Sequence, residues 1–185
     1  MIKWIESLIA KAVRRQGLSR NRIGIETEDE SVARILTVVE RNIKKTKCCT
    51  FITYSTDGPT ARVVMPFRPS TDLTIHIGTL PTSTKARQAA ETGKAVLVYS
   101  AGLSAGVTAY CDAELIKDDV QRRHWWRPLF FAYWTQGPGD DYAVIRCRPY
   151  AFEVFAPGAG VGPAPLGLRS ARIQQEQGQW RVAPV

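Results

Sequence analysis

Short runs of β-branched and aromatic residues, separated by turn residues, fill most of this 185-residue chain and constrain its fold more than any other feature. Most consecutive runs are close enough for hairpin connections, and one helix, from Ser83 to about Gly93, is inserted between them. A doubly wound sheet would need helices between most strands, so the pattern predicts an α+β, mainly β fold, an antiparallel barrel with helices on its outside. The runs that predict strands span residues 48–55, 60–65, 73–78, 95–101, 107–116, 142–147 and 152–155, with a terminal hairpin at 169–175 and 179–182.

A chain of this length is expected to form a single domain, residues 1–185, with a core large enough to fold without disulfides. For residues 1–27 the pattern predicts a basic amphipathic helix at 2–16 followed by a linker. We expect this helix to pack on the domain or on a partner subunit; the alternative is that it lies on a membrane surface. Residues 28–155 form the expected core, and residues 156–185 a loop rich in Gly and Pro followed by the hairpin.

Two further helices are predicted inside the core. The first spans about 29–45, where Thr27 and Glu30 have the spacing of a capping box and an apolar stripe follows. The second spans 118–134, with Pro128 interrupting it.

The compartment is predicted from what the sequence lacks. No run approaches the roughly 18 to 20 apolar residues of a membrane helix, and the first residues lack the apolar stretch of a secretory signal. We therefore expect a cytoplasmic protein without a membrane span. The four cysteines include no C-x-x-C pair and the chain has two His, which predicts no metal site and favours buried free thiols at Cys48, Cys49, Cys111 and Cys147.

The formal net charge of +8 allows several kinds of anionic partner. Nucleic acid is one, but the strand motifs that interleave basic and aromatic residues for RNA stacking are missing, so we do not expect it. Many of the positive residues fall in 11–22 and 41–47, two helical stretches. An anionic cofactor or substrate would also favour positive charge.

One segment has the features of an anion site. Residues 73–85 read as a strand, a turn rich in hydroxyl groups and the start of a helix, whose N–H groups can bind an anion. Lys85 and Arg62 could supply charge there, and Gly78 would allow close backbone approach. Alternatively, Lys85 is an exposed helical lysine and Arg62 the solvent-facing member of an alternating strand.

Other catalytic signatures are weak. Neither His76 nor His124 belongs to a nucleophile motif, although His124 could serve as a haem ligand or a base. The dense aromatic segment 125–134 is first interpreted as a core or subunit interface, and second as a surface that stacks near a flat cofactor.

The run Thr60-Ala-Arg-Val-Val-Met65, then Gly78-Thr79, then Ser83-Thr84-Lys85-Ala86-Arg87 resembles the pyridoxamine 5′-phosphate oxidase-like flavoproteins. The later Trp126-Arg-Pro128, Gly137-Pro-Gly-Asp-Asp-Tyr142 and Arg148-Pro149 with Phe152-Glu153 are similar to the general-stress-protein branch. The resemblance covers roughly residue 30 to the C-terminus. It implies an FMN-binding split β-barrel that is usually a homodimer.

The resemblance also implies a role for each matched position. Arg62 and Lys85 would bind the FMN phosphate, assisted by Ser83 and Thr84. The neighbouring strand and turn would hold the rest of the cofactor, with Val63, Val64 and Met65 along the isoalloxazine and Gly78 and Thr79 beside the ribityl chain or phosphate. A second subunit would close the pocket, with the tryptophan-rich segment as a candidate lining.

Two departures limit the function that the resemblance implies. No His follows residue 124, so the C-terminal Arg-x-His element that handles substrate in the true oxidases is absent. Ala105-Gly106 falls near the place of a glutamine that many of those oxidases direct toward the flavin. The sequence thus favours an FMN-binding flavoprotein, an oxidoreductase of unassigned small-molecule substrate rather than a vitamin B6 oxidase. The alternatives are a non-catalytic flavin-binding or stress-response module, and a barrel that binds deazaflavin or haem.

Overall fold

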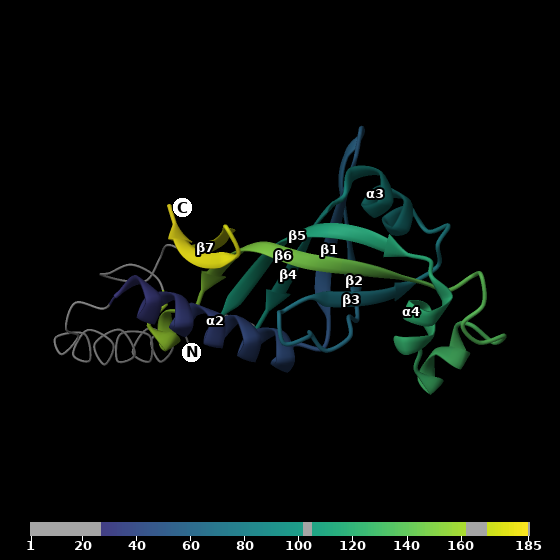
Figure 1. The fold of residues 1–185 in the computed structure, drawn as a ribbon, viewed down its shortest axis with the longest axis horizontal. Helices are drawn as coiled ribbons and strands as arrows, with labels where there is room; N and C mark the ends of the chain where they lie inside the picture. Colours follow the sequence, from purple (N-terminus) through teal and green to yellow (C-terminus); the bar gives the residue numbers. More distant parts are fainter. Residues whose placement is uncertain (1–26, 102–104, 162–169, 185) are drawn as a thin grey trace, which may run out of the picture.

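The computed structural model describes residues 27–101, 105–161 and 170–184 (Figure 1). The amphipathic helix expected at residues 2–16 lies outside them. The helices are α2 (Glu28–Lys45), α3 (Thr84–Thr92) and α4 (Asp119–His124), with 3₁₀ turns at Pro128–Ala132 and Pro157–Ala159. The strands are β1 (Cys49–Ser55), β2 (Gly58–Val64), β3 (Ile75–Thr79), β4 (Lys94–Ser100), β5 (Gly106–Ile116), β6 (Ala143–Phe155), β7 (Ala171–Glu176) and β8 (Gln179–Ala183).

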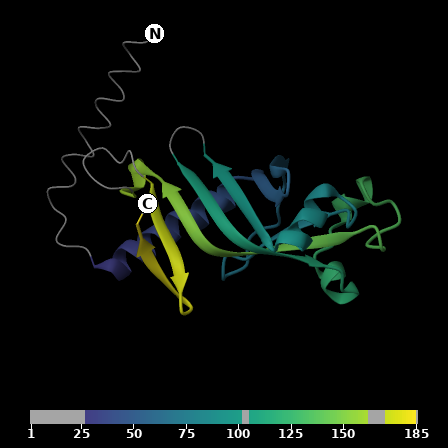
Figure 2. The same cartoon turned by 90° about the horizontal axis from the view of Figure 1, so that it is seen from above.

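The described strands form one antiparallel sheet in the order β2-β1-β4-β5-β6-β7-β8, and β3 pairs with β6 off this path. β6 has two partners along one edge, because residues 143–147 pair with β3 and residues 151–154 with β7. Figure 2 shows β5 and β6 as long curved strands that lead from the hairpin β7–β8 toward α4. The fold is therefore the expected α+β split barrel.

The main hydrophobic core lies between α2 and the strands. α2 begins with the predicted capping box, in which Thr27 accepts from the Glu30 N–H and Glu30 bonds back to the Thr27 N–H. Its apolar stripe of Val32, Ile35, Val39 and Ile43 is buried against the barrel. In Figure 1, α2 runs below the strands and α3 lies above them, where it contacts β1 and β5.

Two predicted elements differ from the structure. The helix expected at 118–134, with Pro128 interrupting it, is the short α4, which already ends at His124, and a 3₁₀ turn at Pro128–Ala132; Arg127, which precedes Pro128, has extended backbone angles. The strands expected at 142–147 and 152–155 are one continuous strand, β6. The strand tolerates Pro149, although proline has no backbone N–H to donate. Pro149 falls between the stretch that pairs with β3 and the stretch that pairs with β7, and it lies beside an irregularity in the β5–β6 register.

The cysteines differ from the prediction at one position. Cys49, Cys111 and Cys147 are buried free thiols of the core, as expected, but Cys48 is exposed. Burial raises the pKa of the Cys49 thiol to about 12 and the pKa of Cys111 well above its usual range. The buried thiols are therefore neutral and unreactive at physiological pH. No helix in the described part of the chain is both long and apolar enough to cross a membrane.

Candidate functional site

Arg62 is held on the side of β2 that faces α3. It pairs with Phe51 in the β1–β2 ladder, and its guanidinium donates to the Thr53 hydroxyl at 2.7 Å and to the Phe51 carbonyl at 3.3 Å. The side-chain carbonyl of Gln88, from α3, accepts from Arg62 at 3.4 Å and from Thr53 at 2.5 Å. These bonds fix the guanidinium between a strand and a helix that are far apart in sequence.

Lys85 lies in the first turn of α3, half-buried and close to Arg62. Burial lowers the pKa of Lys85, and the positive charge of Arg62 lowers it further. Burial also lowers the pKa of Arg62. Within the described ranges, neither side chain forms an ion pair with a carboxylate. Two partly desolvated cations therefore repel one another at a place where an anion would relieve both.

The N-terminus of α3 adds hydrogen-bonding groups to these charges. Ser83 is the N-cap, its hydroxyl accepts from the Ala86 N–H, and it lies 2.9 Å from the hydroxyl of buried Thr79. Thr84 follows as the exposed first residue of the helix. The first turn contains no acidic residue, so its free N–H groups and the positive end of the helix dipole remain available to an anion.

The structure thus brings Arg62, Lys85, Ser83 and Thr84 to one end of α3, with Thr79 beneath them. We call Arg62, Lys85 and the N-terminus of α3 the cation cradle. Sequence reasoning missed Gln88 and Thr53, which orient Arg62. The signal for Gln88 is its position three residues after Lys85, which places both on one face of the helix.

The residues expected along the isoalloxazine divide between two environments. Val64 packs against the core, whereas Val63 is 73% exposed and Met65 56% exposed. β2 ends one path of the sheet, so its outer edge has no neighbouring strand among the described residues. The described part of the chain therefore does not enclose Val63 and Met65.

Gly78 allows close approach of β3 to an aromatic ring. A side-chain carbon there would lie 3.2 Å from the Tyr142 ring and 3.3 Å from its hydroxyl, closer than most real contacts. Tyr142 is fully buried and lies at the centre of an aromatic cluster with Trp126, Phe130 and Trp134. Gly78 lets the strand approach this ring. The cluster agrees with the first interpretation of the aromatic segment, a hydrophobic core.

The two histidines lie beside the same aromatic segment. His76, on β3, stacks on Trp125 with ring centroids 3.8 Å apart and planes 19° apart. Burial, chiefly, and the charge of Arg146 lower the pKa of His76 to about 4, so it is neutral at physiological pH. His124 is exposed and meets Trp125 edge to face. Neither histidine contributes a side chain to the cation cradle.

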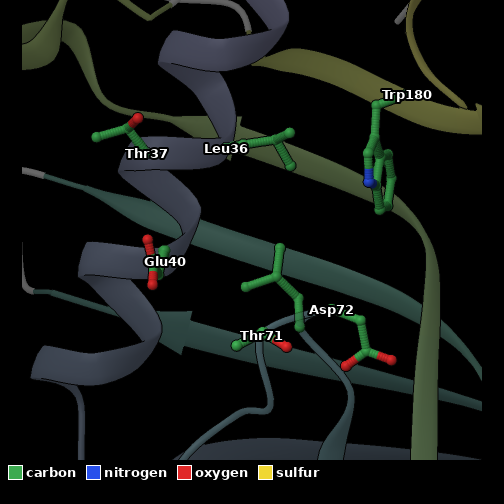
Figure 3. Close-up of a pocket in the computed structure, with 7 residues that line it drawn as sticks. Leu36, Thr37, Glu40, Thr71, Asp72 and Trp180 are labelled. Atoms are coloured by element: carbon green, nitrogen blue, oxygen red, sulfur yellow. The ribbon is translucent and has the colours of Figure 1, made fainter.

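A cavity of about 250 Å³ lies elsewhere, between α2, the loop before β3 and β8 (Figure 3). Figure 3 shows Leu36 pointing toward Trp180 across it. Its two carboxylates already have partners, because Asp72 accepts from the backbone and hydroxyl of Thr74, and Glu40 pairs with Lys44. Its lining shares no residue with the cation cradle.

Solved structures share this fold at low sequence identity. A protein of Clostridium acetobutylicum related to general stress protein 26, of the pyridoxinephosphate oxidase family, has a TM-score of 0.59 at 16% identity over 66% of this chain and 89% of its own. PhzG from Burkholderia lata 383, in complex with tetrahydrophenazine-1-carboxylic acid, has a TM-score of 0.62 at 15% identity over 88% and 96%. A pyridoxamine 5′-phosphate oxidase-related, FMN-binding protein from Nostoc punctiforme has 0.54 at 14% identity over 85% and 93%.

No protein-family model matches the sequence, and no curated protein is significantly similar to it. The structural likeness therefore identifies the fold, a split barrel of the kind found in pyridoxamine 5′-phosphate oxidase and general stress protein 26 structures.

Proposed function

We propose that this protein binds FMN and that the cation cradle holds the phosphate of the cofactor. One observation carries the proposal: Arg62 and Lys85 converge, both partly desolvated, with no carboxylate partner in the described part of the chain. A phosphate monoester carries close to two negative charges at pH 7 and would neutralise both cations. The FMN-binding protein of the same fold supports this choice of ligand.

Different residues of this chain suit different parts of the FMN molecule. Ser83 and Thr84 offer hydroxyl and N–H donors to the phosphate at the start of α3. Gly78 and Thr79 lie on the strand that leads to this helix, within reach of a ribityl chain. Val63 and Val64 at the end of β2, and Met65 directly after it, offer apolar contact to a flat ring.

We further propose that a second copy of the chain completes the site. The exposed apolar side chains of Val63, on the terminal strand β2, and of Met65, directly after it, support this, because a bound flavin ring needs a second wall. Further exposed apolar side chains lie on and beside the 3₁₀ turn at 128–132 and could contribute to the same interface: Leu129, Phe131 and Tyr133.

A bound flavin supplies electron and hydride transfer, so we propose the general class of flavin-dependent oxidoreductase and name no substrate. The free thiols support the cytoplasm as the compartment, since disulfides form in oxidising ones.

The proposal is tested by replacing Arg62 and Lys85 together with Ala and titrating FMN by the quenching of its fluorescence. Each charged contact to a phosphate contributes about 1.5–3 kcal/mol, so the Kd should rise by roughly 100-fold or more.

The matched control removes two lysines that lie outside the cradle, Lys44 and Lys94, with the same change in net charge. It should leave the Kd within a few-fold. Equal Kd values for the two double variants, both still folded, would refute the phosphate assignment.

A further inference from the structure

A second cavity, of about 300 Å³, lies on another side of α2. One wall is a face of α2 that carries Arg41, Asn42 and Lys45. The opposite wall consists of small residues directly after β4, directly before β5 and in the segment after β6: Ala101, Ala105, Ala156, Gly158 and Ala159. None of these residues belongs to the cation cradle, and the volume suits a small molecule.

Asn42 is the most informative residue of this cavity. Its side chain is 5% exposed, and its Oδ1 has no hydrogen-bond partner in the described part of the chain. Buried polar atoms are nearly always paired, and an unpaired one destabilises the folded state. A leucine of the same shape would avoid this cost on the buried face of a helix. The unpaired acceptor therefore indicates a ligand that brings an O–H or N–H donor.

Arg41 and Lys45 supply the second chemical requirement. They lie four residues apart and so occupy neighbouring positions on the surface of α2, beside Asn42. Both are exposed, and among the described residues neither forms an ion pair with a carboxylate. By contrast, Lys44 on the same helix pairs with Glu40 at 2.5 Å. The free cations at the mouth of the cavity favour an anionic group on the ligand.

The wall of alanines and glycine completes the description of the ligand. Side chains of this size leave room for an apolar body and offer it no hydrogen bond. We propose that the cavity binds a small organic acid with a carboxylate at one end, which pairs with Arg41 and Lys45, and a hydroxyl or amino donor at the other, which bonds to Asn42 Oδ1.

The probe for this proposal is 4-hydroxybenzoate, measured by calorimetric titration of the purified full-length protein. Benzoate, which lacks the donor, and phenol, which lacks the carboxylate, are the matched controls. We expect 4-hydroxybenzoate to bind at least about tenfold more tightly than either, because each control leaves one polar requirement unmet. Absence of binding at millimolar concentration, or equal binding of benzoate, would overturn the proposal.

Two variants locate the site. Asn42→Leu should remove the preference for the hydroxyl and raise the Tm by about 2–4 °C, because the unpaired acceptor is gone. Arg41→Ala combined with Lys45→Ala should weaken binding of 4-hydroxybenzoate about tenfold or more, whereas Lys44→Ala should not change it. Retained preference for the hydroxyl in the Asn42→Leu protein would contradict the assignment.

The cation-cradle variant separates this proposal from the flavin site. Arg62→Ala with Lys85→Ala should lose FMN binding and retain the binding of 4-hydroxybenzoate. Loss of both ligands from a folded variant would mean that the organic acid occupies the cradle, and would overturn the second site.

Discussion

The chemistry of this protein concentrates in the electrostatics of a few side chains. Lys85 is a lysine whose charge is disfavoured in the folded chain, first by burial and then by Arg62. Groups whose pKa values are displaced by burial and a specific charged neighbour are frequent at functional sites. The bonds from Thr53 and Gln88 keep Arg62 in place despite this repulsion. The arrangement stores an unfavourable interaction that a bound phosphate would remove.

A pH dependence of FMN affinity follows from this displaced pKa. The folded protein loses the Lys85 proton at a lower pH than an ordinary lysine, whose pKa is 10.5, because its charged form is disfavoured. FMN affinity should therefore fall as pH rises through this lowered pKa, whereas the phosphate itself is fully ionised above its second pKa of about 6.

The matched variant is Lys85→Arg, because arginine remains charged throughout this range. It should bind FMN with nearly constant Kd as pH rises toward the ordinary lysine pKa of 10.5, while the unaltered protein weakens below that pH. Parallel curves for the two proteins would show that Lys85 does not contact the phosphate.

Most helices and strands of this fold could be predicted from the sequence, because hydrophobic periodicity and turn residues are local signals. The capping box of Thr27 and the apolar stripe of α2 locate that helix from sequence. The two strands expected at 142–147 and 152–155 form one strand, β6, because the residues between them, Pro149 included, fall between two partner strands, an environment that depends on pairings distant in sequence.

The candidate site was predictable to a lesser extent. Arg62, Ser83 and Lys85 could be found because charge and hydroxyl groups at a helix start have a recognisable chemistry. Gln88 had only its spacing from Lys85 as a signal, and Thr53 had none, since neither residue type has a distinctive pattern until the fold brings it to Arg62. The exposure of Val63 could not be predicted either, because an alternating apolar pattern does not show which face of an edge strand is left exposed to solvent.

At the level of elements, the contact between β3 and the aromatic segment can be tested at Gly78. Gly78→Ala places a methyl group 3.2 Å from the Tyr142 ring, which should destabilise the protein by about 1–3 kcal/mol. Gly106→Ala is the matched control, as a strand glycine whose added carbon would meet its nearest atom at 3.9 Å. Urea unfolding should show a lower midpoint for Gly78→Ala alone; equal midpoints would contradict the close packing described here.

Among the described residues, β2 and β8 are the two terminal strands of the sheet path, and the β2 end carries the exposed Val63. Exposed edges and apolar side chains favour association, which supports the proposal that a second copy covers this end of the sheet. The cofactor proposed here and the second copy are linked, because the same β2 residues would contact both.

The assembly is tested by Val63→Asp, which places a charge on the exposed edge. Light scattering after size-exclusion chromatography should give a dimer mass for the unaltered protein and a monomer mass for the variant, whose FMN affinity should fall as well. Thr56→Asp, in the exposed turn between β1 and β2, is the control and should remain dimeric. A monomer mass for the unaltered protein at micromolar concentration would exclude the proposed interface.

The most direct test of the central claim is the visible absorption spectrum of the purified full-length protein, with mass spectrometry of any small molecule released on denaturation. We expect flavin absorbance and the mass of FMN. If the protein is isolated without cofactor, we expect it to take up one FMN per chain on titration. A protein that is colourless and fails to bind saturating FMN, or that releases a haem or a deazaflavin, would contradict it.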